Sequence, residues 1–439
     1  MLCGLLTMAP AAVQARQWTL QACIQYALEN NISLQKNRLQ RQSAAEDVKL
    51  SQAQLLPSLS LSTSQNVSYT PWPETGSYVI AGDKVQTSID KVYYNGSYGL
   101  NASWTLWNGN RNRDQVKLDQ LAEKQAELDV ATTANSIQEQ IAQLYVQILY
   151  SAEAIKVNEE SLKTSRKNEE RGQAMVSVGK MSRADLAQLT AQRAQDEYSI
   201  VQAESNLSNY KRQLKALLQL TDEEPFDVAT PEATSAMALA DIPTLPSVYE
   251  AAMENRPEIK NAKLGIEGSE LSIKMARAAR LPVVSLNANA GTSTTTMSSN
   301  AWGTQLKNNF GLGAGFTVSI PLLDQRQTKT AVNKASIQRE TYLLDLKDKQ
   351  TTLHADIENY WLQAVTNQNM FKAAQVSTES AQASYELLSE QFQLGLKNIV
   401  ELMTGKDNLI QAQQNELQSK YLAILNINML RFYQTGEMR

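Results

Sequence analysis

Short stretches of alternating polar and apolar residues interrupt patterns that otherwise predict long helices. In "LPSLSLSTSQNVSY", positions 56–69, Ser or Asn occupies nearly every second position from Ser58 onward. The intervening residues are Leu59, Leu61, Thr63, Gln65, Val67 and Tyr69. Alternation of this kind is typical of a strand with two unlike faces. The flanking stretches are rich in Gln, Ala, Glu, Lys and Leu, which favour helix.

The chain is an internal duplication. A shift of 225 positions aligns "ALENNISLQKNRL" at 27–39 with "AMENRPEIKNAKL" at 252–264. From about Gly99 onward the shift is 216, and it stays there for more than 100 residues. The first copy therefore carries nine extra residues between about 62 and 98. Insertions of that kind belong in loops, and Pro71, Pro73, Gly76 and Gly82 predict one.

The first copy, 16–220, predicts a helix that ends near Pro57, a β-hairpin and a helical hairpin. A helix of nearly 70 residues would be about 100 Å long. The predicted ranges are helix 19–56, strands 58–69 and 93–107, long helix 109–177, tip turn 178–181 and return helix 182–219.

The second copy, 248–439, repeats this plan. Its predicted ranges are helix 248–281, strands 283–293 and 309–321, long helix 325–393, tip turn 394–397 and return helix 398–434. Ser182 with Asp185, and Asn398 with Glu401, have the spacing of capping boxes at the starts of the return helices. The copies are joined by 221–247, where four prolines, six acids and no base predict an irregular, solvent-facing linker.

The four strands favour a membrane barrel over a soluble sheet. One face of each strand is mostly apolar, and the other is almost entirely Ser, Thr, Asn and Gly. A soluble sandwich is the alternative, but its solvated face would normally carry charges. Small neutral polar residues suit a water-filled barrel. Because a barrel needs at least about eight strands, several copies must associate. Thr63 and Gln65 lie on the face assigned to lipid: the lipid contact is short there, or the two rise above the membrane.

The N-terminus resembles the later part of a secretory signal peptide. Residues 1–13 are apolar, and a small-x-small site ends at Ala15, which predicts cleavage before Arg16. A buried helix start is the alternative, although Pro10 would break it. Cys3 lies in this leader, and Cys23 is expected to pack on a helix as a small hydrophobe.

Composition excludes several classes of function. The chain has 439 residues, a net charge of −4 and 20% charged residues, so no basic surface for nucleic acid is expected. The sequence offers no Cys/His cluster, phosphate-binding loop or catalytic triad, and His354, the only histidine, is expected to be structural. We therefore predict no enzyme activity, no metal and no cofactor.

Eight motifs in order resemble the TolC-like outer-membrane efflux protein family (outer membrane factors), from about Trp18 to the C-terminus. "ALENN" and "AMENRPEI" resemble its repeat openings, and "LLPSLSLS" and "RLPVVSLN" its helix-to-strand joints. "SWTLWNGNRNR" and "SIPLLDQRQ" resemble its strand-to-helix joints, and "VSVGKMSRADL" and "QLGLKNIVEL" its helix-turn-helix tips.

This resemblance implies a mainly α fold with a β-barrel portion. Three chains would form a 12-stranded barrel in the outer membrane of a Gram-negative bacterium, fused to a periplasmic tunnel of α-helices. The homotrimer would contact outer-membrane lipid through the barrel. Its partners would be a periplasmic adaptor and an inner-membrane transporter of the proton-driven (RND) or ATP-driven (ABC) type. The implied function is a passive exit duct for efflux or type I secretion.

The resemblance also assigns sites at the tips. The turns that meet the adaptor would be those around Gly179 and Gly395, comprising Val178, Gly179, Lys180, Leu394, Gly395 and Leu396. The gate at the tunnel entrance would comprise Asp185, Lys397 and Glu401. A second acid of the family's gate would fall on Thr404, so a double acidic ring is not expected here.

One other function class stays open at this point, a soluble periplasmic coiled-coil adaptor or scaffold. Such proteins also carry helical hairpins, but they need a lipoyl-type β-domain, and no such segment is visible in the sequence. The cargo, whether drug, metal, siderophore or protein, also stays open.

Overall fold

The computed structural model describes residues 17–72, 76–80, 83–87, 91–221, 226–231 and 233–438, with backbone alone for 76–80 and 83–87. The predicted cleavage site at Ala15 and Arg16 and the leader cysteine Cys3 lie outside these residues. The chain divides into two compact units. The first comprises Met1–Leu39, Glu127–Ala262 and Asp345–Arg439, and the second Gln40–Ala126 and Lys263–Leu344. Each unit therefore draws on both sequence repeats.

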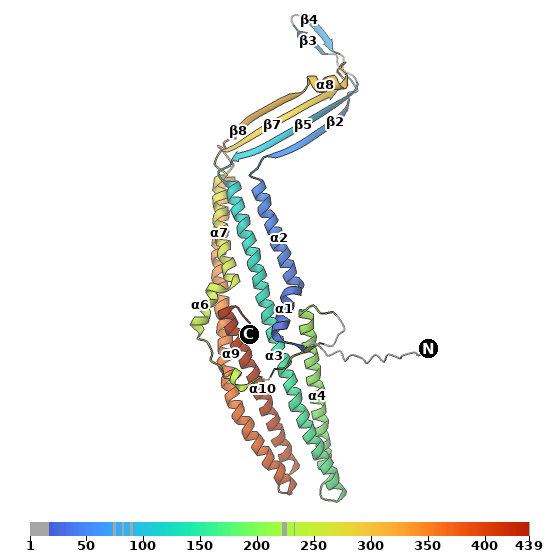
Figure 1. Ribbon diagram of the computed structural model, residues 1–439, viewed down its shortest axis with the longest axis vertical. Helices are drawn as coiled ribbons and strands as arrows, with labels where there is room; N and C mark the ends of the chain where they lie inside the picture. The colour runs from blue at the N-terminus through green and yellow to red at the C-terminus, as the bar shows by residue number, and fades with distance from the viewer. Residues whose placement is uncertain are drawn as a thin grey trace, which may run out of the picture. The chain divides into compact units, whose positions relative to one another are not determined.

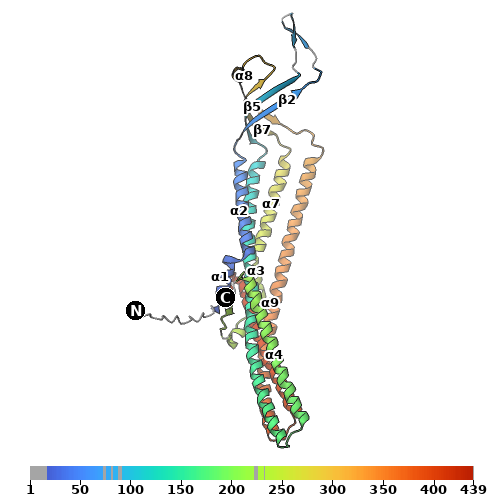
Figure 2. The same cartoon turned by 90° about the vertical axis from the view of Figure 1, so that its right-hand side faces the viewer.

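Two long helical hairpins form much of the first unit. Helix α3 (Arg111–Ser177) is followed by its return helix α4 (Arg183–Leu217). Helix α9 (Gln327–Gln393) is followed by α10 (Ile399–Thr435). Figures 1 and 2 show α4 beside α3 and α10 beside α9 down to the two turns. The two long helices have 67 residues each, about 100 Å of helix.

The helix expected over 19–56 is two helices, α1 (Leu20–Asn30) and α2 (Ile32–Ala53). Asn31 separates them because its side chain accepts hydrogen bonds from the amides of Ser33 and Leu34, which caps α2, and donates to the carbonyl of Leu217.

The helix expected over 248–281 is likewise two, α6 (Leu245–Asn255) and α7 (Pro257–Ala278). Here the break falls at Arg256, because a residue before proline disfavours helix. Arg256 occupies the position equivalent to Asn31, and its guanidinium bonds Glu139 and lies 4.2 Å from the ring centre of Tyr433. Tyr433 in turn is the counterpart of Leu217, so the same two positions meet in both copies.

The described parts of the segment 221–247 contain regular structure that the sequence did not predict. Strand β6 (Asp227–Val228) pairs in parallel with β1 (Gln17–Trp18), and a short helix, α5, covers Ser235–Ala238. Val228 and Ala238 are buried, and the Tyr145 hydroxyl donates to the carbonyl of Ala229. The acids and prolines predicted solvent exposure, but the apolar residues between them pack against the helices.

The second unit holds a four-stranded antiparallel sheet in the order β2-β5-β7-β8. Its strands are β2 (Ser58–Tyr69), β5 (Val92–Trp107), β7 (Val283–Thr295) and β8 (Gly311–Ser319). They lie side by side in Figure 1. The pairing of β5 with β7 joins the hairpins of the two copies into one sheet.

Two predicted loops contain regular structure. The insertion of the first copy includes the strand pair β3 (Gly76–Ile80) and β4 (Asp83–Thr87) rather than loop alone. The connection between β7 and β8 contains the helix α8 (Trp302–Asn308). Both elements are too short to give a clear periodic pattern in the sequence.

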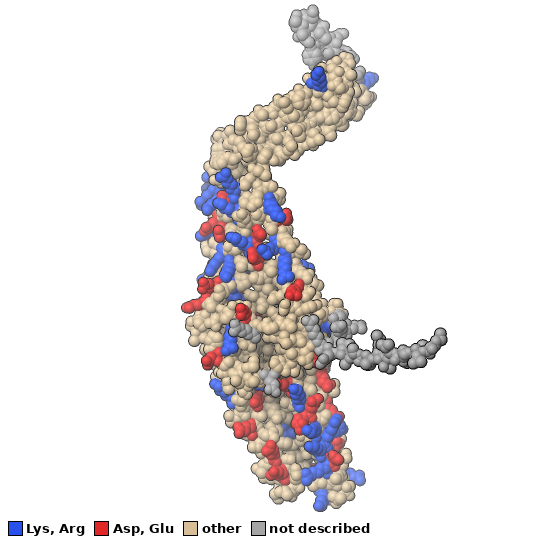
Figure 3. Space-filling model, in the orientation of Figure 1, with Lys and Arg blue, Asp and Glu red and all other residues tan. Residues whose placement is uncertain are grey.

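The register of the sheet brings like residues together on each face. Leu59, Ala102, Ala288 and Ala314 form one row across the four strands, followed by the row Leu61, Leu100, Ala290 and Leu312. On the other face the rows are Ser60, Asn101, Asn289 and Gly313, then Ser62, Gly99, Gly291 and Gly311. The sheet therefore has one apolar face and one neutral polar face, and Figure 3 shows its surface almost free of charge.

Candidate functional site at the helix tips

The two tip turns have the same backbone structure. Gly179 and Gly395 have φ of 74° and 75°, a conformation that side chains with a Cβ disfavour. Each turn forms the pair of hydrogen bonds of a Schellman motif. The longer-range bond of the pair runs from the amide of Lys180 to the carbonyl of Met175 (2.8 Å) in the first turn, and from the amide of Leu396 to the carbonyl of Gln391 (2.9 Å) in the second. The glycines thus reverse the chain between each long helix and its return helix.

Large apolar side chains are exposed beside these glycines. Val178 is 67% exposed, Leu394 74% and Leu396 71%. Lys180 is also exposed. We define the tip surface as Val178, Gly179, Lys180, Leu394, Gly395 and Leu396; three of its side chains are large and apolar, and Lys180 is its one charged member. Exposed apolar groups that gather in this way are typical of protein interaction surfaces.

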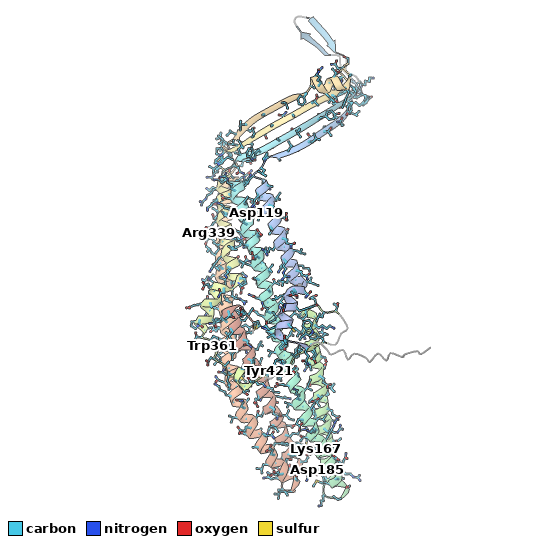
Figure 4. The ribbon with its side chains drawn as sticks, viewed as in Figure 1. Asp119, Lys167, Asp185, Arg339, Trp361 and Tyr421 are labelled. Carbon is cyan, nitrogen blue, oxygen red and sulfur yellow. The ribbon has the colours of Figure 1, made fainter. Side chains whose placement is uncertain are left out.

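Asp185 lies in the first turn of α4. Its amide donates to the Ser182 hydroxyl (3.0 Å), and that hydroxyl donates to the Asp185 carboxylate (2.8 Å). The expected capping box is therefore half formed: Ser182 caps the helix, but the shorter carboxylate binds the hydroxyl instead of the Ser182 amide. Figure 4 labels Asp185 close to the α3–α4 turn.

Glu401 and Lys397 form a bonded pair at the start of α10. The Lys397 ammonium lies 2.5 Å from the Glu401 carboxylate. That carboxylate also accepts from the Asn398 amide (3.2 Å), and the Asn398 side chain accepts from the Glu401 amide, so the capping box is complete. The Lys397 hydrogen bond, with the Asn398 amide second, holds the pKa of Glu401 below its usual value. Asp185 and Glu401 are thus each held within their own helix start.

A buried ionic cluster that the sequence analysis missed joins the two hairpins. Lys406 on α10 is 4% exposed and pairs with Asp196 on α4, 5% exposed. Ser165 on α3 donates to the same carboxylate (2.5 Å) and accepts from the Lys406 ammonium. Burial lowers the pKa of Lys406, and the Asp196 carboxylate opposes that shift. The Lys406 cluster therefore fixes α3, α4 and α10 to one another above the tips.

A signal for this cluster exists in the duplication. Asp196 and Ser165 align with Ala412 and Ala381, and Lys406 aligns with Thr190. Charged or polar residues that replace small ones in one copy indicate that the two copies differ in their contacts. The helical periodicity alone could not tell that these residues face each other.

Cys23 and His354, for which the sequence predicted structural roles, both pack against other parts of the fold. Cys23 is fully buried in α1, and burial raises the pKa of its thiol to about 12. The His354 ring packs edge-on against Tyr249 with ring centres 5.0 Å apart. Over the described ranges, no three His, Cys, Asp or Glu side chains are grouped as a metal site would need. No helix in the described part of the chain is long and apolar enough to cross a membrane.

Comparison with known proteins identifies the class. The model of the outer membrane efflux protein family matches residues 23–219 and 248–433. Toxin and drug export protein A of Aggregatibacter actinomycetemcomitans is 22% identical, over 92% of this chain and 83% of its own length. Outer membrane protein TolC of Vibrio cholerae is 23% identical, over 92% and 88%. A solved structure of CusC matches with a TM-score of 0.80 and 18% identity, covering 95% of this chain and 92% of that chain.

This chain belongs to the outer membrane efflux protein family. It is an outer-membrane protein of a Gram-negative bacterium with a large periplasmic part, and it acts in transport as a conduit. The expected fold of long helical hairpins with a β portion is confirmed. The family assignment overturns the alternative of a soluble periplasmic adaptor.

Proposed function

We propose that three copies of this chain form the exit duct of a tripartite efflux or type I secretion system. The observation that carries this proposal is the sheet, with its two unlike faces in register across four strands. In the described structure β2 and β8 each pair with one neighbour, so both edges are available to another copy. Three copies supply twelve strands, which is enough to close a barrel.

In this arrangement the neutral polar face lines the water-filled lumen and the apolar face contacts lipid. Leu61, Leu312 and Phe316 are strongly exposed in the single chain. Exposed apolar side chains in such number are unfavourable in water, but lipid accommodates them. Over the described strands β2, β5, β7 and β8, the polar face carries no charged residue, which suits a passive conduit for small toxic compounds or proteins.

The tip surface is proposed as the docking site of a periplasmic adaptor, which links the duct to an inner-membrane transporter of the RND or ABC type. The exposed Val178, Leu394 and Leu396 support this role, because they place large apolar side chains in solvent beside the two glycine turns. Threefold symmetry would repeat the surface three times around the tunnel entrance.

Asp185, Lys397 and Glu401 are proposed as the gate at that entrance. In a trimer, Glu401 would form a ring of three carboxylates. The Lys397 pair and the capping box hold this carboxylate in one position, which is what a narrow resting aperture requires.

Planar bilayer recordings test the duct and the gate together. The wild-type protein is expected to show small conductance, and Glu401→Ala with Asp185→Ala a larger one, because the charged constriction is removed. Glu379→Ala, an exposed position on α9, is the matched control and should behave as wild type. If no variant shows any conductance in the bilayer, the proposed duct is refuted. If all variants show equal conductance, only the proposed gate is refuted.

A further inference from the structure

We infer that α8 is an interfacial anchor that binds the anionic, phosphate-bearing headgroup of an outer-leaflet lipid. The inference rests on the proposed function, since it takes the apolar face of the sheet as the lipid-facing one. It adds a lipid-binding site, with Trp302 as the aromatic contact and Lys307 as the phosphate ligand.

The continuous apolar rows of the sheet are interrupted at the level of α8. The last of the consecutive apolar rows contains Leu61, Leu100, Ala290 and Leu312. The next rows on the same face are Thr63, Tyr98 and Thr292, then Gln65, Gly96 and Thr294. Gln65 donates to the Thr63 hydroxyl (2.8 Å), so these polar groups bond among themselves. The apolar surface is therefore interrupted between Leu61 and Thr63, and we place the edge of the hydrocarbon region there; Val67 and Tyr69 follow on the same face beyond the polar rows.

Helix α8 packs on this face and at this boundary. The ring of Trp302 meets that of Tyr98 edge-on, with centres 6.3 Å apart. The Thr292 hydroxyl donates to the carbonyl of Leu306 (2.7 Å). Gln305, 6% exposed, accepts from the Thr295 amide (2.8 Å). These three contacts hold the seven-residue helix against β5 and β7.

The outward side of α8 has the composition of a membrane interface. Trp302 is 58% exposed, and Phe310, immediately before β8, is exposed as well. With Tyr98 they place three aromatic rings at the boundary, as in the aromatic girdles of outer-membrane barrels. An indole with one apolar and one polar edge is suited to the headgroup level.

Lys307 supplies the charge. It is exposed, and it is the only ionisable residue between Arg280 and Asp324 in the sequence. Figure 3 shows basic atoms at the α8 end of an otherwise uncharged sheet surface. A single cation beside the aromatic rings, with no carboxylate in the segment to neutralise it, is complementary to a phosphate headgroup.

Depth-dependent quenching tests the position of α8. Bimane is attached to Gly303→Cys, where an added side chain meets open space, in full-length protein lacking Cys3 and Cys23 and reconstituted in phosphatidylcholine vesicles. Phe316→Cys on the apolar face and Val178→Cys at a tip are the references. A nitroxide at the lipid headgroup should quench the label at position 303 most strongly. A nitroxide in the acyl chain should quench the label at position 316 most strongly.

The references separate the two levels of inference. Position 178 should escape both quenchers. If position 303 also escapes both, or if the acyl-chain nitroxide quenches it as strongly as position 316, the interfacial assignment of α8 is wrong but the barrel proposal is unaffected. If position 316 escapes both quenchers, the proposed function itself fails.

Lipid preference tests Lys307. Quenching of the label at position 303 by nitroxide-labelled phosphatidylglycerol should exceed that by labelled phosphatidylcholine with about fivefold preference, as expected for one basic group at an anionic surface. Lys307→Gln should abolish the preference, and Lys347→Gln, an exposed lysine of α9, should keep it. Equal preference in wild type and Lys307→Gln, or displacement of the labelled lipid by inorganic phosphate alone, would overturn the assignment.

Discussion

Two glycines near the tips show how the duplicated copies reach the same packing with exchanged residues. A Cβ at Gly172 of α3 would lie 2.6 Å from Leu189 Cδ1 of α4, and a Cβ at Gly405 of α10 would lie 2.6 Å from Leu388 Cδ1 of α9. Under the shift of 216, Gly172 aligns with Leu388 and Leu189 with Gly405. Each hairpin thus pairs one leucine with one glycine, on opposite helices in the two copies.

Gly405→Ala is therefore expected to destabilise the second hairpin. Overpacking against Leu388 costs about 1–3 kcal/mol, and the better helix propensity of Ala returns about 1 kcal/mol. The net loss should lower the thermal unfolding midpoint. Gly405→Ala with Leu388→Ala should be less unstable than the sum of the two single changes. Gly268→Ala is the control: its Cβ would meet Leu118 Cδ1 at 3.2 Å, so it should cost less stability than Gly405→Ala. Additive effects of Gly405→Ala and Leu388→Ala would contradict the pairing of these two residues.

At the same scale, Glu401 makes the tip sensitive to acid. Its pKa is depressed in the folded protein, chiefly by Lys397. A depressed carboxyl pKa stabilises the folded state above the unfolded value of 4.5, and the contribution is lost as the pH falls through the folded pKa. The protection of the amides at the start of α10, taken relative to the intrinsic exchange rate at each pH, should fall below this pH in wild type. In Glu401→Gln the protection should already be lower at neutral pH and should change little further in acid.

At the scale of elements, packing of the helices depends on a few polar contacts within a mostly apolar interface. Next to the tip turns, Leu189, Phe392, Ile399 and Leu402 form a small cluster that both hairpins share. Above it, the Lys406 cluster crosses from α10 to α3 and α4. The apolar contacts stabilise the packed helices but tolerate small shifts between them. The Lys406–Asp196 ion pair forms only when the helices are in one register.

Loss of Lys406 should be costly. Lys406→Met leaves the Asp196 carboxylate buried without its cation, which typically costs about 3–5 kcal/mol. Lys406→Met with Asp196→Leu should recover most of that loss, because no charge then stays buried. Lys49→Met removes an exposed ion pair with Glu46 and should cost less than about 1 kcal/mol. Thermal unfolding in detergent measures all three; a Lys406→Met loss as small as that of Lys49→Met would show that the cluster contributes little.

At the scale of the whole molecule, the four-stranded sheet is incomplete as a barrel. The polar rows of Ser60 and Ser62 and the apolar rows of Leu59 and Leu61 run unbroken from one edge strand to the other. A monomer in water would expose both edges and the entire apolar face, which favours aggregation. The proposed assembly of three copies in lipid would remove both liabilities together.

We therefore expect native mass spectrometry of the detergent-extracted protein to show three chains. The trimer should resist mild detergent, because twelve paired strands have no open edge. Heating should dissociate it in a single transition as the strands separate. A stable monomer, or a ring with another number of chains, would contradict the twelve-stranded barrel.

The repeated plan can be read from the sequence alone: period-2 strands, long helical patterns, glycine turns and their order. These are local signals, set by side-chain alternation, by proline at 57 and by the left-handed backbone that Gly179 and Gly395 allow. Which elements meet depends on the folded chain. Pairing of β5 with β7, the bond from Asn31 to Leu217, the contact of Trp302 in α8 with Tyr98 and the Lys406–Asp196 contact all join residues far apart in the chain. Periodicity assigns a residue to a face of its own element, but the partner of that face depends on packing of the whole chain.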